Sequence, residues 1–84
     1  MVANIRVTDN MATMADIEKR ITLTVNSFMK NNRLNQSDIG KILGVGQSSV
    51  ARRFTGKCSW LVRDVQALAN IGVDFSHLFD NEEV

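Results

Sequence analysis

Residues 36–57 read QSDIGKILGVGQSSVARRFTGK, and this stretch decides the fold. Its apolar residues fall at helical spacing in two blocks, which predicts one helix over about 36–43 and a second over about 47–55. Gly44 lies where the first helix needs a residue with positive φ to end and turn. Gly46 is an acceptable N-cap for the second helix. The residues expected to pack the two helices on each other and on a shared core are Ile39, Ile42, Leu43, Val45, Val50 and Phe54.

The first of these helices carries two further signals. Asn35 is a strong candidate for its N-cap, with Asp38 at the third helical position. Gly40 costs about 1 kcal/mol relative to alanine inside a helix. A glycine at this position therefore predicts that the following helix approaches so closely that a β-carbon would clash.

The outward face of the second helix is polar and basic, a chemistry suited to base edges and phosphates. Residues 28–63 hold seven Lys or Arg and one Asp, a formal charge of +6, whereas residues 64–84 hold five carboxylates and no Lys or Arg. This basic middle predicts a polyanion-binding face, and chance segregation of charge is the alternative. The residues on the outward face are Gln47, Ser48, Ser49, Arg52 and Arg53.

The flanking segments also show helical periodicity. An amphipathic helix of about four to five turns is expected after Thr13, whose capping partner is Asp16. The alternating, β-branched run at 21–25 leaves a strand as the local alternative. Ser59 is expected to cap a fourth helix over about 60–71, and Asp74 to cap a short fifth helical turn over 75–79. The chain is therefore predicted to be all-α, a bundle of about five helices over residues 13–79.

The two ends of the chain are expected to lie outside this bundle. Residues 1–12 lack helical periodicity and are predicted to be a flexible terminus. An arm that reaches over DNA or a dimer partner, with Arg6 as its contact, is the alternative. Residues 80–84 are interpreted as a solvated acidic tail.

Composition excludes several functions. No apolar run is long enough to span a membrane, and no signal peptide opens the chain. The single cysteine, Cys58, cannot form an internal disulfide, and with one histidine, His77, it cannot build a Cys-rich metal site. We therefore expect a cytoplasmic protein that is not an enzyme and binds no cofactor or metal. Trp60 is expected to anchor the fourth helix on the core, with base stacking as the alternative.

The segment 34–57, LNQSDIGKILGVGQSSVARRFTGK, resembles the helix-turn-helix domains of the phage repressor and Cro group, also called XRE-like regulators. The segment 50–73, VARRFTGKCSWLVRDVQALANIGV, looks like small regulators of actinobacteria and the immunity repressors of their phages. The resemblance implies a lambda-repressor-like DNA-binding domain whose second motif helix enters the major groove of DNA.

The resemblance also implies roles for individual residues. It assigns base contacts to Gln47, Ser48, Ala51 and Arg52. It assigns phosphate contacts to Gln36, Thr55 and Lys57. Ser49 and Arg53, on the outward face of the second helix, are further predicted phosphate contacts. The family usually has an apolar residue where this chain has Arg53, so we expect Val50 and Phe54 to form the core pair and Arg53 to lie at the flank, free to reach phosphate.

The leading functional prediction is a sequence-specific DNA-binding transcriptional regulator, a phage or prophage repressor that occupies a two-fold operator. Phe75, Leu78 and Phe79 either seal the core or form part of a homodimer seam. Monomeric binding at several half-sites is the alternative to a dimer. An antitoxin-like, excision or assembly factor keeps the fold but acts through a protein partner. A helical protein-interaction module with no nucleic-acid role is the third reading.

Overall fold

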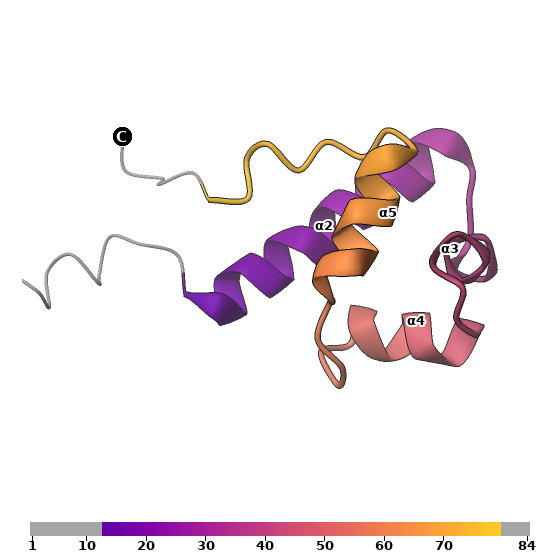
Figure 1. Ribbon diagram of the computed structural model, residues 1–84, viewed down its shortest axis with the longest axis horizontal. Helices are drawn as coiled ribbons and strands as arrows, with labels where there is room; N and C mark the ends of the chain where they lie inside the picture. The colour runs from indigo at the N-terminus through magenta and orange to yellow at the C-terminus, as the bar shows by residue number, and fades with distance from the viewer. Residues whose placement is uncertain (1–12, 80–84) are drawn as a thin grey trace, which may run out of the picture.

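The computed structural model describes residues 13–79, and within that range it holds four helices and no strand. Figure 1 shows α2 as the longest helix, with α5 crossing it and with α3 and α4 together toward one end. The fold is therefore all-α, as predicted, and residues 21–25 belong to a helix. The predicted N-terminal arm (1–12) and acidic tail (80–84) lie outside the described residues. The helices are α2 (Met14–Asn32), α3 (Gln36–Leu43), α4 (Gln47–Phe54) and α5 (Val62–Asn70).

Local sequence signals explain where α2 begins and ends. The Asp16 amide donates to Thr13 Oγ1 (3.1 Å), and the Thr13 amide donates to Asp16 Oδ2 (3.3 Å), so the predicted capping box is present. At the other end Arg33 adopts the left-handed conformation with φ 56°, and the Leu34 amide donates to the Met29 carbonyl (2.9 Å). This arrangement turns the chain away from α2 and into the cap of α3.

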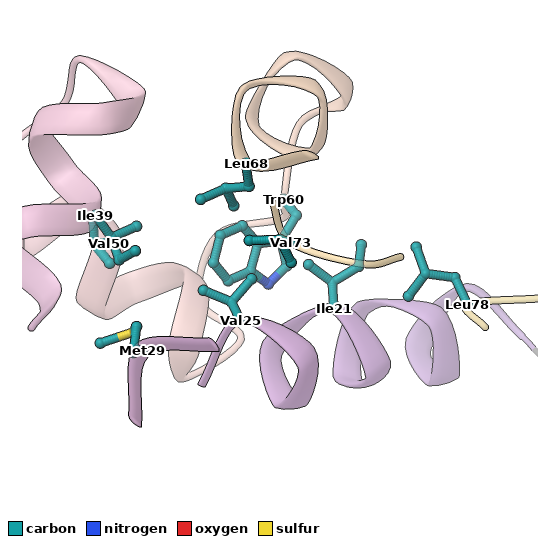
Figure 2. Packing of buried hydrophobic residues seen from close by; sticks show 9 residues of the cluster. All are labelled: Ile21, Val25, Met29, Ile39, Val50, Trp60, Leu68, Val73 and Leu78. Atoms are coloured by element: carbon teal, nitrogen blue, oxygen red, sulfur yellow. The ribbon is translucent and has the colours of Figure 1, made fainter. Parts of the chain in front are cut away.

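The core runs along one face of α2. Ile21, Val25 and Met29 are buried one turn apart. In Figure 2, Ile39 and Val50 close one end of the cluster and Leu78 the other, while Trp60 and Leu68 pack above the middle of α2. The core thus joins α2 to every other helix of the described chain. Its buried residues are Ile21, Val25, Met29, Ile39, Val50, Trp60, Leu68, Val73 and Leu78.

The α3–α4 pair is joined by a tight turn with the predicted glycine geometry. Asn35 Oδ1 accepts from the Asp38 amide (2.9 Å), and Asp38 Oδ2 accepts from the Asn35 amide (2.9 Å). Gly44 ends α3 with φ 75°, and the Val45 amide donates to the Gly40 carbonyl (2.9 Å). An added β-carbon on Gly40 would lie 2.7 Å from the Val45 carbonyl oxygen, so the predicted clash is present, but the atom it meets belongs to the turn before α4 and not to that helix.

The fourth helix begins later than predicted. Ser59 is not its cap; α5 starts at Val62, and Leu61 is the N-cap residue, whose amide donates to Asp64 Oδ2 (2.8 Å). The reason lies in Trp60, which is only 6% exposed and is held against α2. The chain must therefore stay extended until Trp60 has reached the core, and the helix starts only after it.

The predicted turn over 75–79, with Asp74 as its cap, is present, but residues 76–79 form turns and do not make a fifth helix. The Ser76 amide donates to Asp74 Oδ1 (2.9 Å), and the Leu78 amide donates to the Phe75 carbonyl (3.2 Å). A five-residue segment gains little from helix formation alone. It is fixed instead by its contact with α2, where Arg20 Nη1 donates to the Leu78 carbonyl (2.8 Å).

Of the three residues predicted as a core seal or a dimer seam, two pack in or against the core and one is exposed. Leu78 is 6% exposed and belongs to the core, and Phe75 packs against it in a half-buried position. Phe79 is 75% exposed. None of the helices between residues 13 and 79 is both long and apolar enough to cross a membrane.

Candidate nucleic-acid interface

The α4 helix has one apolar and one polar face. Val50 is fully buried, and Phe54, one turn later, packs against the core from a half-buried position. This confirms the predicted core pair. Gln47, in the first turn, is exposed, and so are Ser48 and Arg52 on the side turned away from Val50, with Ala51 half-buried between them. Figure 1 shows α4 at the border of the molecule. The four residues assigned to base contacts are therefore brought together on one helix face.

The first turn of α4 has no side-chain cap. Gly46 is its N-cap residue, and no side chain accepts a hydrogen bond from the first-turn amides. The Ser49 amide donates to the Gly46 carbonyl (3.1 Å). In α2 and α3, by contrast, Thr13 and Asn35 each accept a first-turn amide. The positive end of the α4 dipole thus remains open, an environment that favours phosphate oxygens.

A loop after α4 carries two of the predicted phosphate contacts. Thr55 and Lys57 are both exposed. The Arg52 carbonyl accepts from the Lys57 amide (2.8 Å), and the Thr55 hydroxyl donates to the same oxygen (3.3 Å). Gly56 makes this tight loop with φ +82°. The loop therefore holds a hydroxyl and an ammonium group next to the C-terminal end of the polar face.

Two of the remaining predicted phosphate contacts, Gln36 and Ser49, are half-buried. Gln36 is the first residue of α3. Because Asn35 already accepts the Asp38 amide, the side chain of Gln36 is better placed than that amide to meet a phosphate. The basic residues outside α4 that the structure leaves exposed in this part of the chain are Lys30, Arg33, Lys41, Lys57 and Arg63.

Arg53 does not lie at an exposed flank, and that expectation is wrong. Its side chain is 5% exposed, and its Nε donates to Asp64 Oδ2 at 2.8 Å in a buried ion pair. Its Nη1 donates to the Ser49 carbonyl (3.0 Å). The guanidinium is therefore engaged inside the protein. Burial of a charge requires a partner, and here that partner lies eleven residues away on another helix.

Trp60 lies behind α4 and is not open to bases, so base stacking by this residue is wrong and core anchoring is confirmed. Its indole Nε1 donates to Thr22 Oγ1 (3.0 Å), and its amide donates to Glu18 Oε1 (3.0 Å). The ring meets Phe54 edge-on, with centroids 5.6 Å apart. Phe54, the last residue of α4, is thus connected to α2 through Trp60.

Sequence reasoning missed three residues that support this site: Glu18, Thr22 and Asp64. Glu18 and Thr22 are four residues apart on α2, a spacing that places two polar groups on one face. Asp64 occupies the third position of α5, where a carboxylate is expected to serve as a cap. Neither signal identifies Trp60 or Arg53 as the partner. Between residues 13 and 79 no group of three or more His, Cys, Asp or Glu side chains could hold a metal ion.

Comparison with known proteins agrees with this geometry. A family model, described as the BetR domain, matches residues 9–84. The chain is thus in the class of helix-turn-helix-like DNA-binding domains of phage and bacterial regulators. In particular, it belongs to the BetR domain family, which indicates a DNA-binding regulatory role with DNA as the partner. No curated protein and no solved structure shows significant similarity to the chain.

Proposed function

We propose that the protein is a sequence-specific transcriptional repressor of a phage or prophage, acting in the cytoplasm on an operator in double-stranded DNA. In this proposal α3 and α4 form a helix-turn-helix of the phage repressor and Cro type, and α4 is the recognition helix in the major groove. One observation carries the proposal. Gln47, Ser48 and Arg52 are exposed together on α4, whereas Val50 of the same helix is fully buried.

The chemistry of this face fits direct reading of base pairs. A glutamine amide pairs bidentately with adenine and an arginine guanidinium with guanine, each pair contributing about 1–3 kcal/mol of discrimination against a wrong base. The open first turn of α4 and the exposed Thr55 and Lys57 supply phosphate contacts at the two ends of the helix. Phosphate contacts at both ends would fix α4 along the groove, and the side chains between them would read the sequence.

A repressor of this type binds a two-fold operator as a dimer, one recognition helix in each half-site. Phe79 is 75% exposed and is the member of the predicted seam that remains available for such a contact. Pairing on DNA alone would serve equally well, since each half-site needs one copy of α4. The spacing of half-sites selected by the protein distinguishes the two arrangements.

The test begins with selection from a pool of random DNA duplexes, followed by sequencing of the bound fraction. We expect a motif that repeats with two-fold symmetry. Titration of the selected duplex then compares wild type with the double variant Gln47→Ala, Arg52→Ala. We expect this variant to lose its preference for the selected duplex over a scrambled one while retaining salt-sensitive binding to both.

The matched control is Lys19→Ala with Gln66→Ala, which also removes one positive charge and one side-chain amide. Lys19 and Gln66 are exposed on α2 and α5, so we expect the control to keep the preference. Equal loss in both double variants would show that α4 does not read the sequence. An absence of any DNA binding at low salt would instead favour a protein-interaction module.

A further inference from the structure

The buried ion pair between Arg53 and Asp64 has a position that core packing alone does not require. Both side chains are at most 5% exposed, and the bond of Arg53 Nε to Asp64 Oδ2 is 2.8 Å long. Replacing such a pair by apolar residues is often neutral or stabilising, because the cost of burying two charges offsets their attraction. A buried ion pair is therefore weak support for a role in stability, and its place in the fold suggests another.

The pair connects two points of the main chain. Arg53 Nη1 donates to the Ser49 carbonyl (3.0 Å), which ties the guanidinium to the first half of its own helix. On the other side, the same Asp64 Oδ2 that accepts from Arg53 also accepts from the Leu61 amide (2.8 Å), at the start of α5. The Ser49 carbonyl of α4 is thus linked to the Leu61 amide of α5 through one guanidinium and one carboxylate.

The apolar contacts of α4 do not fix its orientation by themselves. α3 packs closely on both α4 and α5, whereas the backbones of α4 and α5 approach one another less closely. Val50 fastens α4 on one side, and Phe54 fastens its last turn to Trp60. Apolar contacts tolerate small rotations of a short helix, whereas the bonds of a guanidinium have fixed directions.

We infer that the Arg53–Asp64 pair sets the orientation of α4 and thereby the sequence selectivity of DNA binding, without contacting DNA. This inference rests on the proposed function. Gln47, Ser48 and Arg52 read base edges only if α4 has the correct rotation in the groove. Arg53 is then a positioning residue: it lies next to Arg52 in the chain, but one guanidinium is held inside and the other is free to reach the bases.

The test uses the full chain with the double variant Arg53→Met, Asp64→Asn, which removes both charges at similar side-chain length. Two properties are measured. The orientation of α4 relative to α2 and α5 comes from residual dipolar couplings of the backbone amides without DNA. Selectivity comes from selection among random duplexes, together with the salt dependence of binding. Arg53→Lys is the second variant, since it keeps the charge but cannot bond Ser49 and Asp64 in the same fork.

We expect the couplings to show that the orientation of α4 in the double variant differs from wild type. In Arg53→Lys the change of orientation should be smaller. The preference for the selected duplex over random DNA should fall about tenfold or more, as when one bidentate base contact is lost. The loss should spread over several positions of the motif. Arg52→Met, the comparison variant, should instead relax the motif at a single position. The salt slope of the double variant should equal that of wild type.

Two results would overturn the inference. The first is wild-type couplings for α4 in the double variant, or in Arg53→Lys should the double variant fail to fold. The second is an unchanged motif with a salt slope smaller by about 0.9, which would make Arg53 a phosphate contact. A wild-type protein without any DNA preference would refute the proposed function instead, and the couplings would still decide whether the pair orients α4.

Discussion

A β-carbon placed on Gly40 would lie 2.7 Å from the carbonyl oxygen of Val45. Gly40 is inside α3 and Val45 is in the turn that leads to α4, so this relationship measures how closely the turn folds back over α3. The neighbouring atom belongs to the backbone and cannot rotate away as a flexible side chain would. The position of α4 therefore depends on a missing methyl group in α3.

We expect Gly40→Ala to destabilise the protein although alanine is the better helix former. The gain in helix propensity is about 1 kcal/mol, and overpacking costs about 1–3 kcal/mol, so the net loss should be about 1 kcal/mol. Urea unfolding followed by Trp60 fluorescence measures it. The control is Gly46→Ser, because Gly46 has open space and φ −76°. A serine there should add a few tenths of a kcal/mol through capping. Greater stability of Gly40→Ala than of wild type would contradict the predicted clash.

The hydrogen bond from Trp60 to Thr22 gives a second prediction. Thr22→Val removes the acceptor of a buried indole N–H, which should cost about 1–3 kcal/mol of unfolding free energy. Thr24→Val is the matched control, since the Thr24 hydroxyl donates only within its own helix, to the Arg20 carbonyl (2.7 Å). We expect the control to change stability by less than about 0.5 kcal/mol. Equal effects in the two variants, measured by the same urea titration, would show that the indole bond contributes little.

The segment after α5 gives a third prediction through two adjacent residues. Leu78→Ala should cost about 2–5 kcal/mol, because it leaves a cavity at the end of the core. Phe79→Ala should change monomer stability by less than about 0.5 kcal/mol, because the side chain is exposed. Chemical denaturation separates the two variants. Sedimentation equilibrium of Phe79→Ala tests the dimer seam, and a weakened dimer would support it.

The capping box of α2 predicts a pH dependence. Hydrogen bonds from the Thr13 backbone and hydroxyl lower the pKa of Asp16 below its ordinary value of 3.8. A carboxylate whose pKa is lower in the folded state stabilises that state above its unfolded pKa, and this contribution is lost as the pH falls through the folded pKa. The stability difference between wild type and Asp16→Asn should therefore shrink between pH about 6 and pH about 2.5. A difference that stays constant over this range would argue against the box.

Asp74 titrates in the same acidic window, because hydrogen bonds from Ser76 lower its pKa. Wild-type stability alone would therefore not isolate the α2 cap. Comparison with Asp16→Asn does, since the variant keeps Asp74. The carbon resonances of the two carboxyl groups, followed by NMR, give the direction of each pKa shift separately.

The exposed lysine of the α4–α5 loop gives a prediction for DNA binding. Lys57→Gln should weaken binding to all duplexes alike and lower the slope of log K against log salt by about 0.9, the effect of one lost phosphate contact. Lys19→Gln, on α2, should leave the slope unchanged. Salt titrations of fluorescence anisotropy give both slopes. A lowered slope for Lys19→Gln as well would mean that the protein binds DNA through general charge and not through the α4 side.

The beginnings of α2, α3 and α4 were predictable because their signals are local. Thr13 with Asp16, Asn35 with Asp38, and Gly46 each act within a few residues of the helix start they control. The start of α5 was not predictable in this way. Serine is a common N-cap residue, so Ser59 predicts a helix start. Trp60, however, is bonded to Thr22 and Glu18 of α2, which lie 38 and 42 positions earlier in the chain.

Arg53 shows the same limit within the candidate site. On a short basic helix, an arginine is expected at the surface, where most arginines lie. Its burial depends on Asp64, which the charge distribution had placed with the acidic end of the chain. The rotation of α4 could still be predicted, because Val50 and Phe54 identify the buried face whatever the partner of Arg53. The set of cationic side chains that remain available to DNA could not be predicted.

The bond between Arg20 and the Leu78 carbonyl, 58 residues apart, has a consequence during synthesis of the protein. The α3–α4 pair uses contacts between near neighbours and can form as soon as both helices have left the ribosome. The end of the core beside Ile21 stays open until Leu78 arrives, so nascent chains that end before this residue leave Ile21 uncovered. Such chains hold the helices proposed to read DNA but lack the last residue that closes the core. We expect protease resistance to arise in one step, at a chain length that releases Leu78, and not gradually as the helices emerge.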